Sequence, residues 1–174
     1  RIGLDTARRS LATLNNRQLL CLKDLASFGE LASKLWQHSI ATAAAASVLA
    51  RHFTHIPPEE ALLAGLIHDV GIFYLLFKAN QNPELRNRPD SLQYLIVQWH
   101  DSIGLSLAYA LELPERIAES IRDHDQPRPF IPVPHNLAEV VFVANILAGA
   151  SYEWQRAEIP HAEQCRPEVI HPAY

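Results

Sequence analysis

A histidine followed directly by an aspartate, His68-Asp69, is the feature of this sequence that points most clearly to chemistry. The pair closes an amphipathic apolar segment and lies just before Gly71. Adjacent residues on a helix point about 100° apart, so both side chains can reach one ion at the helix edge. An imidazole nitrogen and a carboxylate oxygen together suit Zn, Mn, Fe or Ni better than an all-oxygen cage would. A single such pair is common by chance, so its meaning depends on the rest of the chain.

Further positions carry residues that could bind the same ion or a second one. They are His38, His100, the pair His124-Asp125, and Asn145. Each falls on or beside a different expected helix, and bundle proteins build metal sites in their cores from side chains on facing helices. Each histidine taken alone could also be a core or surface residue whose nitrogens are satisfied by hydrogen bonds. The order and helical context of the whole set favour a shared site.

The elements that must position these residues are helices, because apolar residues recur at intervals of three and four and strand patterns are nearly absent. Pro57-Pro58 opens one helix, a kink is expected at Gly71, and Asp90 caps the next helix. Helices are expected over residues 4–14, 17–28, 30–53, 58–79, 91–111, 115–123 and 136–154, with a loop at 80–89 and a non-helical, proline-rich stretch at 127–134. The predicted fold class is all-α, a bundle of about seven to eight helices.

Composition narrows the function classes. With 174 residues and 48% hydrophobic content the chain can form one domain with a substantial core. A net charge of −4 argues against a basic face for nucleic acid. No uninterrupted apolar run approaches the roughly 20 residues that cross a bilayer. Cys21 and Cys165 lie far apart and are expected to be free thiols in a reducing compartment. We therefore expect a cytoplasmic protein that binds neither nucleic acid nor membrane.

The motif-bearing segments together resemble a known family. Glu60–Gly71 is similar to the central helix of the HD metal-dependent phosphohydrolase superfamily, and in particular of the HDOD group, the HD-related output domains of bacterial signalling proteins. The other matching segments are Leu35–Ser39, His100 with Gly104, Leu113–Glu115, Ile121–His124 and Val143–Asn145. The resemblance covers residues 1–156 and implies an HD-type helical bundle, followed by an irregular tail over 157–174. It also implies that the N-terminal subdomain of the family is missing here. The sequence contains no methionine, even at position 1, so we do not expect it to be a complete gene product, and a fragment is one explanation.

The resemblance implies two sets of metal ligands. The primary set would be His38, His68, Asp69 and Asn145, and the supplementary set of two-metal relatives would be His100, His124 and Asp125. Active relatives carry aspartate where this chain has Asn145, and an amide is a weaker, uncharged ligand. They often carry lysine at the position of Ile72, and the paired histidines of two-metal relatives are reduced to His124-Asp125. These departures fall on functional positions while the helical pattern is kept.

Two functions follow from this resemblance. The favoured one is a non-catalytic signal-transduction output or scaffold domain with a degenerate metal site, which binds a partner or a small regulator. Its partner would be a signalling protein or a fused sensor or output domain, and a homo-oligomer is also compatible. The alternative is a metal-dependent phosphohydrolase acting on a nucleotide or phosphodiester, in which metal ions activate a water molecule. The expected cofactor is none, or a weakly bound divalent ion such as Mn, Fe, Ni, Zn or Mg.

The run Ile72–Phe77 is unusually apolar for a helix that precedes a polar loop. Two interpretations remain open for it. The segment is buried in the core or against an upstream subdomain, or it forms an exposed apolar surface, separate from the metal site, on which a partner binds.

Overall fold

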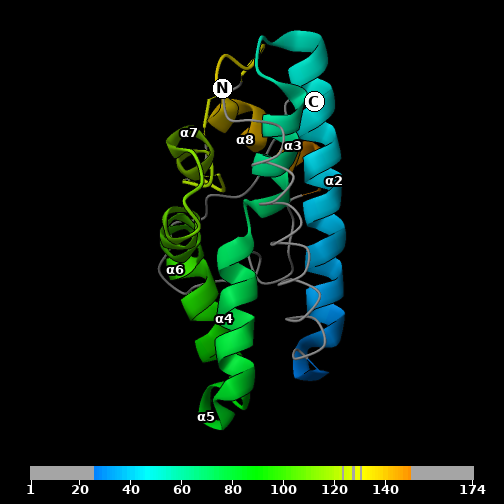
Figure 1. Ribbon diagram of the computed structural model, residues 1–174. Helices are drawn as coiled ribbons and strands as arrows, with labels where there is room; N and C mark the ends of the chain where they lie inside the picture. Colours follow the sequence, from blue (N-terminus) through cyan, green and yellow to red (C-terminus); the bar gives the residue numbers. More distant parts are fainter. Residues whose placement is uncertain (1–25, 123, 127, 130, 150–174) are drawn as a thin grey trace.

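A computed structural model describes residues 26–149 of the chain, except 123, 127 and 130 (Figure 1). The regular elements of this part are the 3-10 helix η1 (Ala26–Phe28) and the α-helices α2 (Gly29–Phe53), α3 (Pro58–Ile67), α4 (Val70–Gln81), α5 (Pro83–Arg86), α6 (Pro89–Ala110), α7 (Glu115–Glu119) and α8 (Leu137–Leu147). They confirm the predicted all-α class. The helix predicted at 4–14, most of the one at 17–28, and the tail at 157–174 lie outside the described residues.

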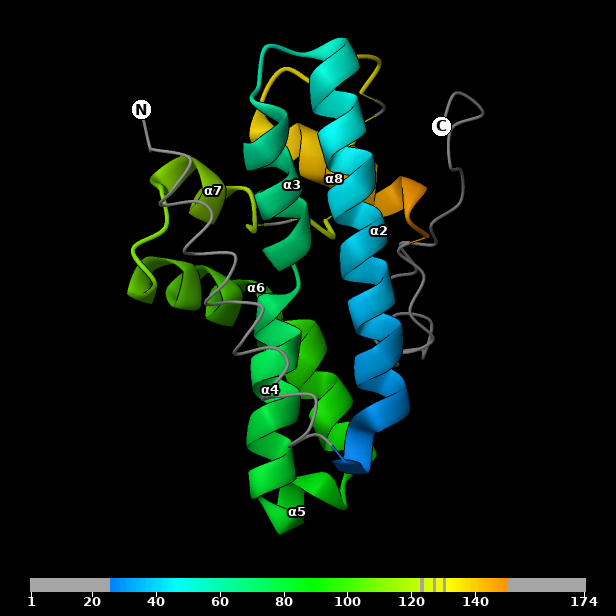
Figure 2. The same ribbon diagram turned by 45° about the vertical axis from the view of Figure 1, so that its right-hand side comes forward.

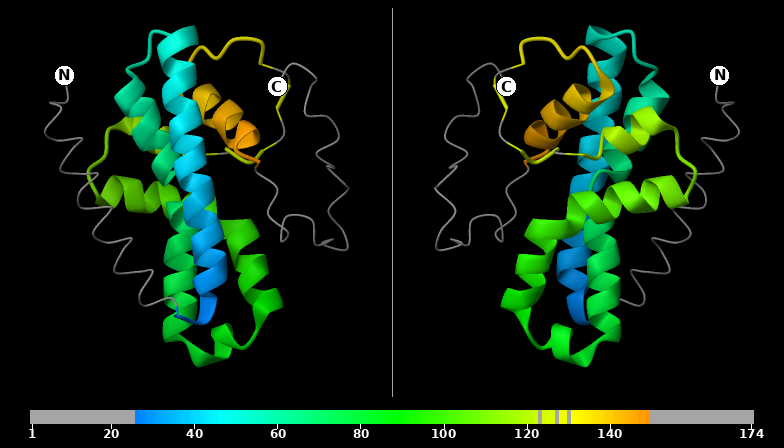
Figure 3. Two further views of the ribbon diagram at one scale, coloured as in Figure 1. Left: turned by 90° about the vertical axis from the view of Figure 1, so that its right-hand side faces the viewer. Right: turned by 90° about the vertical axis from the view of Figure 1, so that its left-hand side faces the viewer.

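The long helix α2 runs along most of the bundle, and α3 and α4 follow one another beside it (Figure 2). Helix α6 packs against α4, while α8 packs against α2 and α3 (Figures 1 and 3). The alanine-rich middle of α2 and Gly65 of α3 let these two helices approach closely. A Cβ atom added at Gly65 would lie 2.9 Å from the Cα atom of Ala43. Small residues therefore set the distance between α2, which carries His38, and α3, which ends just before His68.

The junction between α3 and α4 differs from the predicted continuous helix with a kink at Gly71. Helix α3 ends at Ile67, and α4 begins at Val70, so His68 and Asp69 themselves form the break. Gly71 lies inside α4 and serves another purpose, because a Cβ atom there would lie 2.0 Å from the carbonyl oxygen of His100. The glycine thus permits the close contact of α4 with α6 and does not cause the break.

Two other boundaries around α6 also correct the sequence prediction. The segment 80–89, predicted as a loop, contains α5, which is capped by Asn82; its side-chain oxygen accepts hydrogen bonds from the backbone N–H groups of Glu84 and Leu85. Helix α6 begins at Pro89, which is favoured in the first turn because it lacks an N–H group. Asp90 therefore lies within the helix and is not its cap.

The last helix is shorter than predicted. Helix α8 begins after Asn136, whose side-chain oxygen accepts a 2.9 Å hydrogen bond from the backbone N–H of Glu139. It ends at Leu147, and Gly149 then adopts a φ of 80°, the left-handed conformation that commonly ends a helix. The predicted helix 136–154 thus ends early within the described residues. Helix α7 likewise ends at Glu119, and the predicted extension to 123 is replaced by turns where the structure describes it.

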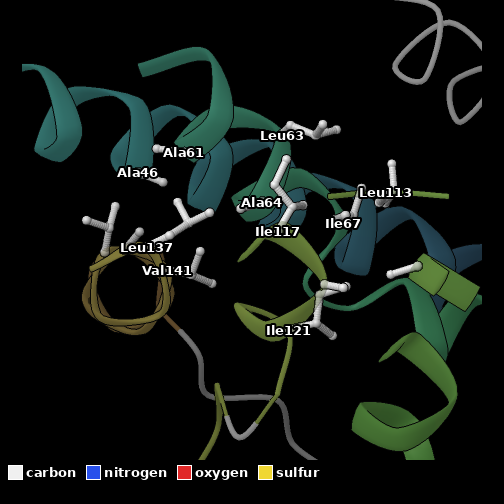
Figure 4. Close-up of a cluster of buried hydrophobic side chains, with 14 of the residues drawn as sticks. Ala46, Ala61, Leu63, Ala64, Ile67, Leu113, Ile117, Ile121, Leu137 and Val141 are labelled. Atoms are coloured by element: carbon white, nitrogen blue, oxygen red, sulfur yellow. The ribbon is translucent and has the colours of Figure 1, made fainter. Parts of the chain in front are cut away.

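Two clusters of buried hydrophobic side chains form the core. The first joins the second half of α2 with α3, α7 and α8 (Figure 4). The second joins the start of α2 with α4 and α6 and contains Ile72, Phe73 and Leu76. The apolar run Ile72–Phe77 is therefore mainly core, and only Tyr74 in it is exposed. The break at His68-Asp69 falls in the chain between Ile67 of the first cluster and Ile72 of the second.

One helical segment of the described chain, Pro58–Gln81, is long and apolar enough to cross a membrane by length and composition. The segment is not an uninterrupted apolar run, because it contains His68, Asp69 and Lys78. The segment is 67% buried inside the protein, and core helices of soluble proteins pass the same test, so it is weak support for a membrane span.

Candidate metal centre

His68 and Asp69 lie side by side at the break between α3 and α4, and each side chain is about 1% exposed or less. The Nε2 atom of His68 lies 3.2 Å from Oδ2 of Asp69. Its other ring nitrogen, Nδ1, lies 2.8 Å from the carbonyl oxygen of Gly65, one turn back on α3. This hydrogen bond fixes the ring so that Nε2 faces Asp69.

His38 and Asn145 complete the side of the site that faces α2 and α8. Nε2 of His38 lies 3.2 Å from Nε2 of His68 and 2.8 Å from Oδ1 of Asn145. It also lies 3.9 Å from Oδ2 of Asp69 and 3.3 Å from the hydroxyl oxygen of Thr42. We call the residues His38, His68, Asp69 and Asn145 the His38 group. Its members come from α2, the α3–α4 break and α8.

Asp69 also belongs to a second set of residues. Its Oδ1 atom lies 3.1 Å from Nε2 of His124, which in turn lies 3.5 Å from Oδ1 of Asp125. Oδ2 of Asp125 lies 3.3 Å from Nε2 of His100 on α6. We call Asp69, His100, His124 and Asp125 the His100 group; one potential ligand atom from each lies within 4.8 Å of those of the others. The two oxygens of Asp69 thus face different groups.

The tautomers of three histidines follow from their backbone partners. Nδ1 of His68, His100 and His124 lies 2.7–2.8 Å from the carbonyl oxygens of Gly65, Ile96 and Ile121 respectively. A carbonyl oxygen only accepts, so each Nδ1 carries the hydrogen and each neutral ring leaves a lone pair on Nε2. Metal-binding histidines are oriented in the same way by a second hydrogen bond. These three rings are therefore set to offer Nε2 to a cation.

Asp101 was missed by the sequence analysis. Its Oδ1 atom lies 3.0 Å from Nδ1 of His124 and 3.2 Å from Nε2 of His100. A carboxylate behind a ligating histidine raises the basicity of the ring and holds its orientation. The signal was present, because His100-Asp101 is a third histidine–aspartate pair in the chain, like those at 68 and 124.

Burial and charge act in opposite directions on the central groups. Burial alone would raise the pKa of Asp69, but the charge of His68 and hydrogen bonds from His124 and His68 hold it well below its usual value. Burial alone would lower the pKa of His124, but Asp125, Asp101 and Asp69 raise it well above the usual value. The three carboxylates around His124 therefore favour its protonated form over the neutral ring.

Burial and charge also act in opposite directions on the pKa values of His100, Asp125 and His38. Burial would lower the pKa of His100, but its contact with Asp125 and the charge of Asp101 raise it overall. Burial would raise the pKa of Asp125, but the charge of His124 and the contact with His100 lower it. The pKa of His38 is lowered, because burial outweighs the attraction of Asp69. The pKa is therefore raised at His100 and lowered at His38, on the other side of Asp69.

The residues present fit a divalent cation. Four imidazoles, two carboxylates and one amide converge, and nitrogen and oxygen donors together suit first-row transition metals. Nε2 of His100 is buried and forms no well-aligned hydrogen bond in the described structure, although carboxylate oxygens lie within 3.3 Å. A buried nitrogen of this kind is expected where a cation is to be bound, because leaving it without a partner costs stability.

All seven residues proposed from the sequence therefore lie in one region. His38, His68, Asp69 and Asn145 meet on one side, and His100, His124 and Asp125 meet on the other. The two sides are joined a second time, because Nδ2 of Asn145 donates a 2.9 Å hydrogen bond to Oδ1 of Asp125. Their role as metal ligands stays a prediction.

An all-helical bundle with this cluster of histidine and aspartate side chains is the architecture of an HD-type domain. The chain belongs to the HDOD domain family, whose model matches residues 1–127. The match includes every residue of the two groups except Asn145. The search of curated proteins found no match.

Among solved structures, the chain is similar to a Shewanella amazonensis SB2B protein provisionally named a metal-dependent phosphohydrolase. The TM-score is 0.63, the sequence identity is 22%, and the similarity covers 89% of this chain and 58% of that one. The chain thus spans little more than half of that protein, and a likeness at this identity concerns the fold.

Proposed function

We propose that this HDOD domain is a non-catalytic signalling module that binds a divalent metal ion inside its helical bundle. The observation that carries the proposal is the enclosure of the ligand atoms. His68, Asp69 and His124 are 1% exposed, and His38 and His100 do not exceed 8%. A hydrolase must place a phosphate group against its metal, whereas ligands enclosed in this way favour an ion held by the protein alone.

The surroundings of Ile72 support a non-catalytic role. This residue occupies the position where active relatives often carry a lysine, and it is 1% exposed within the second hydrophobic cluster. An isoleucine there stabilises the bundle by apolar burial and offers no charge to a phosphate. A cation that would bind substrate has thus been replaced by a core side chain.

The metal in this proposal stabilises the bundle and does not activate water. The site joins segments from α2, the α3–α4 break, α6 and α8, so an ion bound there holds these segments in one arrangement. A partner would then recognise the outer surface of that arrangement. The partner is a signalling protein or a sensor or output domain of the same longer product, with a small regulator as a further ligand class.

One observation favours the alternative function, a metal-dependent phosphohydrolase acting on a nucleotide or phosphodiester. Asp69 directs one oxygen toward each ligand group, as a carboxylate shared by two metal ions would. Pairs of ions about 4 Å apart are used by phosphatases and nucleases to stabilise both the attacking and the leaving oxygen. The name of the Shewanella protein points to the same class of activity for that protein.

A combined stability and activity experiment separates the two functions. Purified protein, stripped with EDTA, would be assayed with bis(p-nitrophenyl) phosphate, nucleoside monophosphates and cyclic dinucleotides, with Mn, Ni, Fe or Mg added. We expect an increase in the melting temperature with metal, lost in His68→Ala, and no turnover above background. The exposed His52 offers a matched control, because His52→Ala removes a histidine from α2 far from both groups. Metal-dependent turnover that disappears in His68→Ala but not in His52→Ala would establish the hydrolase instead.

A further inference from the structure

The long helix α2 carries an uncharged outer surface. Between Lys34 and Arg51 the helix contains no Asp, Glu, Lys or Arg. Its buried side packs against α3 and α8, and no helix of the described residues lies over its other side (Figure 3, left). The side of a surface helix that faces water is normally charged or polar, whereas the centres of protein interfaces are depleted in charge. The outer side of α2 therefore has the composition of a contact surface.

The exposed residues on this side, which we call the α2 face, are Gln37, Ile40, Ala41, Ala44 and Val48. Ile40 is 47% exposed and Val48 is 56% exposed. Association that removes these two apolar side chains from water is favoured by the hydrophobic effect. Single exposed apolar side chains are common on proteins, so the identity of the partner must follow from how these residues are arranged.

The α2 face is symmetric about Ala44. Successive helical residues are about 100° and 1.5 Å apart, so positions four apart are offset by about 40° and about 6 Å. Ile40 therefore lies about 6 Å toward one end of the helix and about 40° to one side of Ala44, and Val48 lies equally far toward the other end and the other side. A two-fold interface needs such a surface, because each residue i that contacts j of the other copy is matched by j contacting i.

We propose that the α2 face joins two copies of this domain in a weak, two-fold symmetric dimer, in which the two α2 helices run antiparallel and cross at Ala44. In this arrangement Ile40 of one copy packs beside Val48 of the other, and the alanines between them let the two helices approach closely. The dimer is independent of metal binding, because His38 lies on the buried side of α2.

Charges at the ends of the face favour a second copy in this orientation. Arg51 is exposed about 10 Å from Ala44 along the helix, and Gln37 is exposed equally far in the other direction. Antiparallel pairing places the guanidinium of Arg51 against the amide oxygen of Gln37 in the other copy, which can accept its hydrogen bond. Parallel pairing would bring the two Arg51 side chains together. Because each copy has a net charge of −4, contact on an uncharged surface also avoids the repulsion between copies.

The size of the face determines how strong the dimer is. From Gln37 to Arg51 the helix is about 21 Å long and about 10 Å wide. A strip of this size is smaller than the roughly 800 Å² per partner that stable complexes bury, and smaller interfaces are typical of transient complexes. We therefore expect monomer and dimer to exchange, with a dissociation constant in the micromolar range or weaker.

Sedimentation velocity of the purified chain, from low to high micromolar concentration, tests the proposal. The sedimentation coefficient of the parent should rise with concentration. Ala44→Glu brings two carboxylates together at the crossing point and should weaken association at least about tenfold, because like charges would face each other. Ala110→Glu makes the same change at an exposed position at the end of α6 and should associate as the parent does. Circular dichroism of both variants would verify that they are folded.

A cysteine cross-link gives a second measurement that introduces no charge. At the usual distance between packed helices, the two Ala44 Cα atoms would lie within about 5 Å of each other, close enough for a disulfide. In a chain that carries Cys21→Ser and Cys165→Ser, Ala44→Cys should therefore give a covalent dimer on mild oxidation. Ile40→Cys should not, because its two copies would be about 12 Å apart along the helices.

A parent that stays monomeric over the whole concentration range would overturn the proposal. Association that Ala44→Glu leaves unchanged, or equal cross-linking of the two cysteine variants, would do the same, because the dimer would then use another surface. If the parent is monomeric and Ala44→Glu lowers the melting temperature more than Ala110→Glu does, the α2 face is covered by another segment of the same chain and not by a second copy.

Discussion

Nδ2 of Asn145 donates a hydrogen bond to Oδ1 of Asp125 over 2.9 Å and so joins helix α8 to the turn that follows α7. These two residues are also departures from the residues of metal-binding relatives. The family resemblance implies a carboxylate at the position of Asn145 and, in two-metal relatives, a second histidine at the position of Asp125. The contact places the carboxylate of Asp125 one hydrogen bond away from the amide of Asn145, so the site still contains a second carboxylate beside Asp69.

This relationship predicts the effect of Asn145→Asp. The new carboxylate would face Asp125 at hydrogen-bond distance, so metal-free protein should lose roughly 1–3 kcal/mol of stability from the lost hydrogen bond and the like charges. Asn145→Ala removes the hydrogen bond without adding charge and is the matched control. Thermal unfolding in EDTA should place the aspartate variant below the alanine variant, and added Mn²⁺ should reverse this order. An aspartate variant as stable as the parent in EDTA would contradict the described contact.

Asp101 should affect metal binding without being a ligand. Asp101→Asn keeps an oxygen near Nδ1 of His124 but removes the charge, whereas Asp101→Ala removes both. We expect Mn²⁺ affinity to fall about tenfold in the first variant and up to about 100-fold in the second. Asp90→Asn, in the exposed first turn of the same helix, is the control and should leave affinity unchanged. Equal effects of the substitutions at 90 and 101 would show that only the overall charge matters.

The stability of the metal-free protein should pass through a maximum near pH 6.5. The raised pKa values of His124 and His100 mean that their stabilising protons are fully present below the unfolded value of about 6.5. That contribution is lost as the pH rises through their folded pKa values. The lowered pKa of Asp69 gives stability that is lost as the pH falls through its folded value, and the lowered pKa of His38 penalises acid in the same direction.

Urea unfolding in EDTA across the acid and alkaline range measures this profile. With saturating Mn²⁺ the alkaline loss should disappear, because the ion replaces the protons of the two histidines. His124→Gln should also flatten the alkaline side. Stability of the parent that rises steadily above pH 6.5 without metal would mean that His124 is not protonated in the folded state.

Gly71 should be among the least replaceable small residues of the described chain. A Cβ atom there would lie 2.0 Å from the carbonyl oxygen of His100 and 2.8 Å from the backbone nitrogen of Gly104, and neither backbone atom can move independently of α6. Gly71→Ala should destabilise the protein by about 3 kcal/mol, the upper end for overpacking, and weaken Mn²⁺ binding by displacing His100. Gly29→Ala is the control, because a Cβ atom at the start of α2 meets nothing within 4 Å. Similar melting temperatures for the two variants would contradict the described packing of α4 on α6.

The sequence allowed prediction of the parts that depend on local patterns. Helix α2 and the start of α3 at the proline pair were predicted closely, because helical period and proline placement are local signals. The convergence of His38 with His68 followed from the family motifs. The break at His68-Asp69 could not be predicted, because Gly71 was interpreted as a kink and its actual role depends on a helix 29 residues later in the chain.

The residues that form the site were easier to predict than the contacts between them. Asp101 was overlooked although it follows His100, because its role depends on where His124 lies. The contact of Asn145 with Asp125 was also missed, since substitutions considered one at a time do not reveal that two of them are neighbours. Both omissions concern contacts between helices, which single-sequence patterns do not specify.

The position of the polar site between two hydrophobic clusters has a consequence for how the protein opens. The cluster of α3, α7 and α8 and the cluster of α4 and α6 are connected through α2 and through a seam of buried histidines and aspartates. Such clusters often behave as separate cooperative units in native-state hydrogen exchange. In the metal-free protein the seam is held only by hydrogen bonds and ion pairs. We then expect the amides of α8 to exchange through a smaller opening than those of α4. A bound ion would join the two clusters, so that they open together. The cooperativity of hydrogen exchange across the bundle would then report whether the site is occupied.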